Sequence, residues 1–350
     1  MTGSITKTLK KAMRVVGSPW GQRITLLVLI CIVMAIFEPV FFRANNAKNI
    51  LLAIAVNGIM VSGMLFTVLV GGMDLSVGSM AGISAAIAFR TAEAAGFTTN
   101  GFLTGCVIAF AVCLVAGFLN GFFVTRFALP AFVVTLAMKY LLFGCNFLVT
   151  KGFFVLPPAH GVSFDIGNKV VLSIPIGGGD MLNIPMPVVI LIIVVAICAF
   201  VLGKTTYGRK LYAIGGNKNV ANLVGINSDG NIIGTFMISS VLAGLGGVML
   251  ASMNGQAGQN TAVGYEGNVL MAMVVGGINL AGGEGGMPGA IFGALLVGII
   301  NNVMVLLSVS SDIQKFVQGV IILAAMTLNV YARRGSAGAS AVKIKGAAKN

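Results

Sequence analysis

Long apolar runs separated by short polar stretches recur along almost the whole chain of 350 residues. A spanning helix needs about 20 mostly apolar residues to cross a bilayer. Runs near that length predict ten membrane segments, centred on residues 24–42, 49–70, 77–96, 102–125, 130–150, 187–203, 231–252, 266–281, 286–308 and 312–331. Glycines between Gly276 and Gly289 blur one boundary, where a re-entrant or broken helix is an alternative. The predicted fold class is an all-α polytopic membrane protein with about ten transmembrane helices and short loops.

Composition agrees with that fold class. Hydrophobic residues make up 57% of the chain and charged residues 9%, with a mean hydropathy of +0.99. Soluble domains carry about a quarter charged residues. The 48 glycines suit helices that approach one another closely in lipid. The five cysteines lie in apolar runs without a C-x-x-C spacing, so they are predicted to be packing residues rather than metal ligands or disulfide partners.

The net charge of +13 would suggest nucleic acid in a soluble protein, but here the position of the charges matters more. Basic residues collect in the cytoplasmic loops of membrane proteins. With the N-terminus inside, fifteen of the 22 basic residues fall in cytoplasmic segments. This predicts a cytoplasmic N-terminal segment over 1–23, a membrane domain over 24–331 and a basic, disordered cytoplasmic tail over 332–350. Membrane lipid is the expected environment, and no nucleic-acid partner is expected.

Two loops stand out within the membrane domain. Residues 151–186, on the outer side, are rich in Gly and Pro and are predicted to be a lid or docking loop. Residues 203–231, on the cytoplasmic side, are polar and basic. Inside this second loop Asn217 can serve as N-cap of a short helix and Gly225 can end it. Val220, Ala221, Leu223 and Val224 supply an apolar face, so the helix 218–224 is predicted to contact another protein.

A weak internal echo relates the two halves of the chain. Residues 70–75 (VGGMDL) resemble residues 275–280 (VGGINL), and residues 117–121 (GFLNG) resemble residues 298–302 (GIINN). The two pairs are offset by different amounts, so the repeat is not in register. Duplicated halves are common in transporters.

The sequence gives little support for a nucleotide site, a metal site or a hydrolytic active site. Gly203-Lys204-Thr205 resembles the end of a phosphate-binding loop, but Cys198 stands where the motif needs a glycine. Any ATP and Mg²⁺ must therefore be bound by a partner chain, and no cofactor is expected in this one. His160 is the single histidine, which is too few for a metal site or a Ser/His/acid set. An enzyme is not expected.

Ionisable residues inside membrane segments can mark ion pathways. Most of those in this chain fall near segment ends, where snorkelling explains them. Arg90 and Glu93 are spaced to pair with each other. Lys139 is the most interior and predicts an internal partner or a water-lined cavity. Because a chain of acids for proton relay is missing, a proton-driven transporter is disfavoured.

The sharpest motif is the stretch Gly71–Ser79. Gly71 and Gly72 allow a tight turn, and Asp74 or Ser76 can cap the next helix. A capped helix start is favoured over direct substrate contact. Gly285, Gly289 and Gly293 are spaced as one stripe for close helix packing.

A path for a solute needs inward polar or aromatic groups, although helix–helix hydrogen bonds explain amides equally well. The candidates by residue type are Asn57, Asn120, Phe132, Asn146 and Asn301, with Asn254, Gln256 and Asn302 as further ones.

Together these stretches resemble the permease subunits of bacterial ABC importers for ribose, xylose, arabinose and galactose. The resemblance covers roughly residues 26–331 and is specific to the family rather than to one sugar. One departure is Gly267-Asn268, where the family usually has Leu-Asp after Gly-Tyr-Glu; loss of that acid bears on substrate preference or docking. The matching stretches are 71–79, 120–121, 130–136, 206–209, 213–217 with Ala221, Gly225 and Ile226, 264–266 and 276–285.

The resemblance implies a homodimeric permease in the bacterial inner membrane. Two cytoplasmic ATPase subunits would dock below it, and a periplasmic solute-binding protein would deliver solute above it. A short loop helix would fit a cleft in the ATPase, and ATP binding would drive alternating access. The residues assigned to this coupling are Gly216, Asn217, Lys218, Val220, Ala221, Leu223, Val224 and Gly225.

Other functions remain open at this stage. One keeps the ABC mechanism with different cargo: a branched-chain amino acid, a nucleoside or a sugar-derived signal. Another is a self-sufficient secondary transporter or channel. The missing proton relay and the basic loop argue against the latter.

Overall fold

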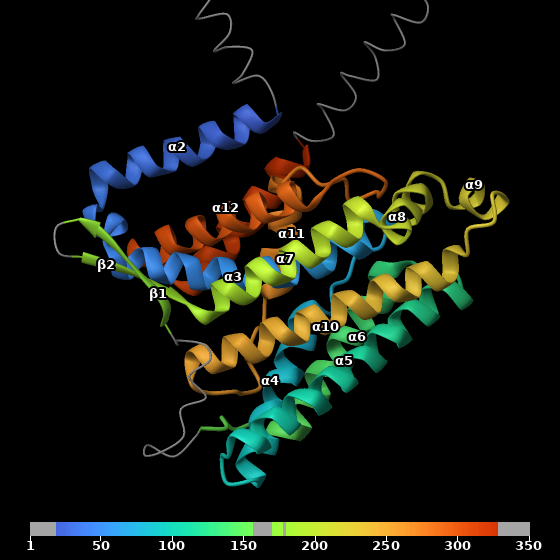
Figure 1. The fold of residues 1–350 in the computed structure, drawn as a ribbon, viewed down its shortest axis with the longest axis horizontal. Coiled ribbons are helices and arrows are strands. Elements are labelled where there is room, and N and C mark those ends of the chain that lie inside the picture. Colours follow the sequence, from blue (N-terminus) through green and yellow to red (C-terminus); the bar gives the residue numbers. More distant parts are fainter. Residues whose placement is uncertain (1–18, 157–169, 178–179, 328–350) are drawn as a thin grey trace, which may run out of the picture.

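Helices form nearly all of the fold in a computed structural model that describes residues 19–156, 170–177 and 180–327 (Figure 1). The predicted segments 1–23 and 332–350 and His160 lie wholly or largely outside these residues. A last, unlabelled helix covers residues 311–327. The labelled elements are α2 (Pro19–Phe37), η1 (Pro39–Phe42), α3 (Ala44–Leu69), α4 (Val77–Ala94), α5 (Thr99–Arg126), α6 (Ala131–Thr150), β1 (Val170–Gly177), β2 (Asp180–Pro185), α7 (Met186–Lys204), α8 (Thr206–Gly216), α9 (Lys218–Leu223), α10 (Ser228–Asn254), α11 (Tyr265–Val275) and α12 (Met287–Leu306).

The helix α3 forms the centre of the bundle. It packs against α10, α12 and α7, and its side chains from Ile54 to Leu69 are buried throughout. α10 in turn packs against α4 and α5. Small residues bring these helices together: a Cβ on Gly121 of α5 would lie 2.6 Å from the Cα of Ile233, and one on Gly247 would overlap the carbonyl of Ala81. Close backbone approach at small residues is the usual way helices associate in lipid.

Six of the described helices are long and apolar enough to cross a membrane: α3, α5, α6, α7, α10 and α12. The chain is therefore a multi-pass helical membrane protein, but the count of ten spans is not confirmed. Each predicted segment does overlap a helix. α4 and α2 are not among the six helices. α4 has 18 residues and carries Arg90 and Glu93, and the apolar part of α2 is only Arg23–Phe37.

The eighth predicted segment, 266–281, is wrong in its extent. α11 ends at Val275 after 11 residues, about 16 Å of helix, which is too short to cross the hydrocarbon core. The chain from Gly276 to Gly286 is a loop, so the broken-helix alternative describes this region better. α12 then packs on α11, and a Cβ on Gly293 would overlap the carbonyl of Ala272. Gly289 and Gly293 thus serve close packing, whereas Gly285 lies in the loop with φ +134°.

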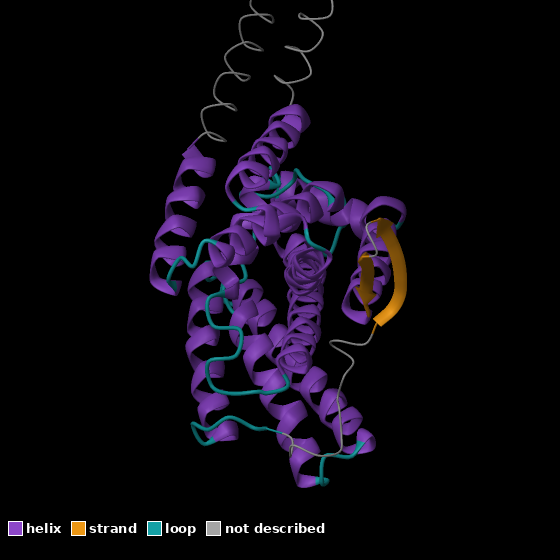
Figure 2. Ribbon diagram, turned by 90° about the vertical axis from the view of Figure 1, so that its left-hand side faces the viewer, coloured by secondary structure: helices purple, strands orange, loops and turns teal. Residues whose placement is uncertain are grey.

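A small antiparallel hairpin accompanies the helices of this all-α membrane domain. β1 and β2 pair between Val170 and Pro185, within the segment predicted to be a lid or docking loop, and lie on the outside of the helices (Figure 2). In the sequence, an apolar run that begins with Val170 and Val171 leads to three consecutive glycines at 177–179, which is a hairpin signal. An isolated bridge also joins Val155 to Ala257, so the two loops at this end of the bundle are tied together.

The sequence echo has a structural counterpart in two helix-ending turns. After α3, Gly71 has φ +79° and the Gly72 N–H donates to the Thr67 carbonyl over 2.8 Å. After α11, Gly277 has φ +71° and the Ile278 N–H donates to Met273 over 2.9 Å. Both are six-residue helix-ending turns that need a left-handed glycine. In the structure Gly71 therefore corresponds to Gly277, whereas the sequence echo aligns Gly71 with Gly276.

Candidate functional site

The loop 203–231 forms two helices at one end of the bundle, where α9 lies beyond the ends of the spanning helices (Figure 1). Only the second helix is predicted from the sequence; α8 is missed because Gly208, Gly215 and Gly216 lower its helix propensity. The Thr205 side chain accepts from the Gly208 N–H and starts α8. Leu211 and Ile214 then face inward and are buried.

α8 also touches the membrane domain through its backbone, at Gly215. A Cβ on Gly215 would overlap both the carbonyl oxygen of Leu69 and the amide nitrogen of Gly283. The Gly283 N–H also donates to the Leu69 carbonyl over 2.9 Å. Gly216, which was assigned to the coupling segment, has open space around its Cα. Gly215 is therefore the residue of this pair that fixes α8 to the bundle.

Two tyrosines of α8 add side-chain contacts to this backbone junction. The Tyr212 hydroxyl donates to the Gly285 carbonyl over 2.9 Å, which reaches the same loop as Gly283. The Tyr207 hydroxyl donates to the Asn231 carbonyl at the start of α10 over 3.3 Å. Burial raises the pKa of Tyr207 to about 12, so this hydroxyl stays protonated as a donor at physiological pH.

The two residues predicted to start and end α9, Asn217 and Gly225, are confirmed in those roles, although the helix stops at Leu223, one residue before the predicted end. The Asn217 side chain accepts from the Val220 N–H over 3.1 Å. Gly225 has φ +82°, and the following Ile226 N–H donates back to the Ala221 carbonyl over 3.0 Å. The helix is therefore fixed at both ends even though it has only six residues.

The apolar face of α9 is divided, which corrects the prediction of one shared face. Ala221 is 2% exposed and packs with Ile214 and Ile232. By contrast Val220, Leu223 and Val224 are 52%, 86% and 71% exposed. Ala221 therefore anchors the helix to α8 and α10, and the other three side chains form the outward surface.

The charged residue of α9 forms an ion pair within the chain. Lys218 pairs with Asp229 at the start of α10, with Nζ 2.9 Å from Oδ1. Both side chains are exposed, so the pair contributes little to stability. The remaining exposed basic residues at this end include Arg126, Lys204, Arg209 and Lys210. The outward surface of α9 is therefore apolar, and exposed basic residues lie around it.

The second group of polar residues surrounds Asp74, in the turn between α3 and α4. Its carboxylate accepts three hydrogen bonds, from the Ser76 N–H (3.0 Å), the Ser76 hydroxyl (2.5 Å) and the Ser239 hydroxyl of α10 (2.8 Å). Asn120 of α5 donates to the Ser76 hydroxyl over 3.1 Å. No side-chain hydrogen bond caps α4, so the capping prediction is wrong. Asp74 instead ties its own turn to α10.

Polar residues also run along one face of α6. Thr135, Lys139, Asn146 and Thr150 are spaced by four, seven and four residues, which places them on one side of a helix. The Thr135 hydroxyl donates to Met73, and its oxygen accepts from the Leu75 N–H. Asn146 donates to the Gln259 carbonyl over 3.0 Å. α6 is therefore joined to the α3–α4 turn at one end and to the 255–264 loop further along.

The internal partner predicted for Lys139 is Glu266. Its Nζ lies 2.7 Å from Oε1, and the two side chains are 30% and 14% exposed. A Cβ on Gly78 would overlap the other carboxylate oxygen of Glu266, so Gly78 makes room for the pair. Arg90 and Glu93 also pair with each other as predicted.

The structure does not bring the solute-path candidates together at one place. Asn301 donates to Asn268 over 3.2 Å and accepts from Gln318 over 3.3 Å. Asn302 exchanges two hydrogen bonds with Asn46, over 2.8 and 3.0 Å. These amides join α12 to α11, to the helix 311–327 and to α3. They act as helix–helix contacts.

The remaining candidates differ in their surroundings. Asn57, Asn120 and Asn146 are buried, and the Oδ1 atom of each has no hydrogen-bond partner in the described part of the chain. Phe132 is half exposed on the surface of α6. Asn254 is exposed and Gln256 is half-buried, both at the end of α10 beside the Val155–Ala257 bridge.

Sequence reasoning missed Ser239, Gly215, Tyr212 and Asn46 as site residues. Ser239-Ser240 is a polar pair inside an apolar run, which is a weak signal on its own. Within the described ranges, no group of three or more His, Cys, Asp or Glu could hold a metal ion.

Comparison with known proteins identifies the family. Residues 46–326 match the model of the permease component of branched-chain amino acid transport systems. The chain is 35% identical to the ribose import permease protein RbsC of Haemophilus influenzae, covering 88% of this chain and 92% of that protein. It is 32% identical to RbsC of Bacillus subtilis (87% and 90%) and 31% identical to the L-arabinose transport system permease protein AraH of Escherichia coli (91% and 93%). No solved structure matches the chain. The chain therefore belongs to the family of transport-system permease components that this model describes.

Proposed function

We propose that the chain is the membrane-spanning subunit of an ATP-driven importer, and that its cargo is a monosaccharide. Two copies form the permease in the bacterial inner membrane, with both termini and α9 in the cytoplasm. Two partner ATPase subunits bind ATP and Mg²⁺, and a periplasmic binding protein delivers the sugar. The similarity to ribose and arabinose permeases over about nine-tenths of the chain supports the choice of cargo.

One observation carries the coupling assignment: α9 is held rigidly yet presents apolar side chains outward. Asn217 and Gly225 fix its ends, and Ala221 anchors it. Leu223 and Val224 are left exposed at a point that lies beyond the ends of the spanning helices (Figure 1). Exposed apolar residues in such a place mark a protein contact. A cleft in the ATPase that covers Val220, Leu223 and Val224 would bury them.

The coupling assignment is tested by association with the ATPase. Leu223→Asp places a charge in the proposed contact, and because Leu223 is so exposed the fold should be unaffected. We expect pull-down of the ATPase to fall by about tenfold or more. Val263→Asp is the matched control, since Val263 is also exposed but lies in the loop after α10, at the opposite end of that helix from α9. Equal association for wild type and Leu223→Asp would overturn the assignment.

The importer assignment is tested by transport in proteoliposomes. The chain alone should move no sugar in response to ATP or to a proton gradient. With its ATPase and binding protein it should take up a labelled monosaccharide when ATP is supplied. Uptake by the chain alone would identify a self-sufficient transporter instead.

The cargo is tested separately, on the cognate binding protein. Calorimetric titration with ribose, arabinose, xylose, galactose, leucine and a nucleoside should give tight binding only for a sugar. Tight binding of leucine or of the nucleoside would keep the ATP-driven mechanism and replace the cargo.

A further inference from the structure

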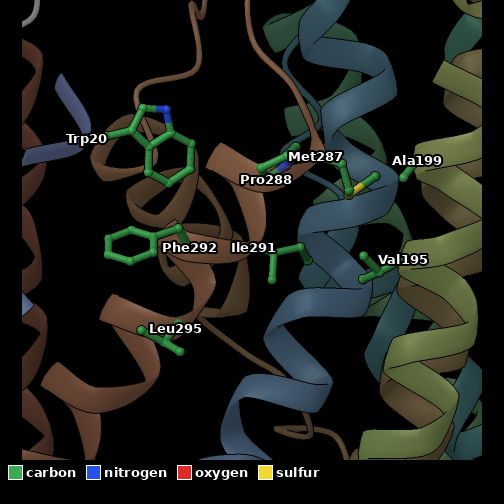
Figure 3. A pocket seen from close by; sticks show the side chains of 8 residues that line it. All are labelled: Trp20, Val195, Ala199, Met287, Pro288, Ile291, Phe292 and Leu295. Atoms are coloured by element: carbon green, nitrogen blue, oxygen red, sulfur yellow. The ribbon is translucent and has the colours of Figure 1, made fainter. Parts of the chain in front are cut away.

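A pocket of about 430 Å³ lies between α2, α7 and α12. Its walls are apolar, and Figure 3 shows the Trp20 and Phe292 rings on one side with Val195 and Ala199 of α7 on the other. The two rings meet edge to face with centroids 5.8 Å apart. Ile291 and Leu295 continue the wall along α12. An apolar space of this size suits a hydrocarbon chain.

A cation stands at the edge of this pocket. The Arg23 guanidinium lies 5.0 Å from the centre of the Trp20 ring, a cation–π contact. It also packs against the loop after α11, where a Cβ on Gly277 would overlap it. Among the described residues, none of the ion pairs involves Arg23. Its positive charge lies beside Trp20, which lines the pocket.

The residues around the pocket indicate its position along the helix bundle. Arg23 touches Gly277, and the same loop contacts Gly215 of α8 through Gly283. The pocket thus lies near the loop that contacts α8. Trp and Arg at the end of a spanning bundle are typical of the layer of lipid headgroups.

We propose that this pocket binds a phospholipid with an anionic headgroup. One acyl chain occupies the apolar space between Trp20, Phe292 and Ala199. The headgroup phosphate is held by the Arg23 guanidinium, which can donate two parallel hydrogen bonds to it. A soluble ligand fits less well, because the walls offer it no polar partner inside the pocket.

The lipid would also bridge elements that are otherwise loosely joined. α2 packs along α12 through Leu27, Ile30 and Met34, while α7 packs on α3. The acyl chain would fill the remaining space between α2 and α7. This inference depends on a membrane location and on no particular cargo.

Native mass spectrometry of the full chain tests the proposal, with phosphatidylglycerol and phosphatidylcholine of identical acyl chains as probes. We expect one phosphatidylglycerol to be retained more strongly than phosphatidylcholine. Arg23→Gln should remove that preference, a loss of about fivefold for one basic contact at the membrane surface. Arg126→Gln is the matched control, because Arg126 is exposed and basic but lies on α5. An Arg23→Gln variant that keeps the full preference would overturn the proposal.

Photocrosslinking locates the lipid without relying on a variant. A phosphatidylglycerol with a photoreactive group on its acyl chain should label peptides that contain Trp20, Met287 or Phe292. Labelling confined to other helices, or none in the pocket, would overturn the proposal. Ala199→Trp, which fills the space, should abolish the labelling in a chain that still elutes as a single species.

Discussion

Lys139 of α6 and Glu266 of α11 form an ion pair, with 2.7 Å between Nζ and Oε1, beside the glycine at the start of α4. Three helices therefore meet at one pair of charges. Glu266 belongs to the Gly-Tyr-Glu motif and Lys139 is the most interior cation, so the sequence marks both residues but not their pairing. Partners inside the membrane domain are costly to separate, because the remaining charge is left without compensation.

The pair should show coupling in a double-mutant cycle. Lys139→Met and Glu266→Gln should each lower the free energy of unfolding by about 1–3 kcal/mol, a moderate value because Lys139 is partly exposed. The double variant should lose less than the sum of the two. Denaturation in mixed micelles measures all four proteins. Strict additivity would show that the two charges do not interact.

The Asp74 turn gives a second prediction. Three donors converge on the carboxylate, and the amide of Asp74→Asn has only one oxygen to accept them. We expect a loss of about 1–3 kcal/mol in the free energy of unfolding, as for other buried donors left without a partner.

Ser239→Ala serves as the comparison for Asp74→Asn. It removes one donor and keeps the acid, so its cost should be smaller. If Asp74→Asn unfolds like the wild type, the carboxylate is not needed as an acceptor.

Gly215 and Gly216 form a matched pair for the contact between α8 and the membrane domain. Gly215→Ala puts a methyl group into the backbone of Leu69 and Gly283, whereas Gly216→Ala meets open space. We expect Gly215→Ala to lower the ability of the assembled importer to couple ATP hydrolysis to uptake by about tenfold, and Gly216→Ala to leave it near wild type. The ratio of sugar taken up to ATP hydrolysed measures this. Equal ratios for the two variants would place the junction elsewhere.

Much of the helical layout could be predicted because apolar runs of spanning length are a strong signal. The ends of α9 were also predictable, since Asn217 and Gly225 are local cap residues whose roles need no tertiary contact. The exposure of Leu223 could not be predicted. A single apolar residue in a six-residue helix can face either way until the helix beneath it is known.

Ala221 and Leu223 should behave differently, because one is an anchor and the other part of the outward surface. Ala221→Asp buries a charge against Ile214 and Ile232 and should lift α9 from α8 and α10. Limited trypsin digestion should then cut at Lys218 several times faster, while Leu223→Asp should leave the rate unchanged. Both variants should lose ATPase association. Slow cutting of Ala221→Asp would show that the anchor tolerates charge.

The amide pair of Asn46 and Asn302 is the fifth test. Changing Asn302 to Leu leaves the buried amide of Asn46 without its partner on α12, and changing Asn46 to Leu leaves the half-buried amide of Asn302 without its partner; we expect a loss of about 0.6–2 kcal/mol from each, the range seen for hydrogen bonds between helices in membranes. The double Leu variant should recover most of it. Thermal melting followed by size exclusion measures the series. A double variant less stable than either single one would contradict the prediction.

The interior polar contacts were harder to predict than the helices for a physical reason. An asparagine in an apolar run is equally suited to a solute and to another helix, and only the neighbour decides between them. Asn301 and Asn302 meet other amides, whereas Asn57, Asn120 and Asn146 each keep an unpartnered oxygen. Those three remain the solute-path candidates whose geometry leaves an acceptor available.

The junction of Gly215 with Leu69 and Gly283 has a mechanical consequence. Side chains absorb a displacement by changing rotamer, but backbone atoms in direct contact have no such freedom. Leu69 stands at the end of α3, five residues before Asp74, and Asp74 is bonded to α10 through Ser239. A displacement of α8 would therefore reach Leu69 at the end of α3 directly, because no side chain lies between the two backbones to absorb it.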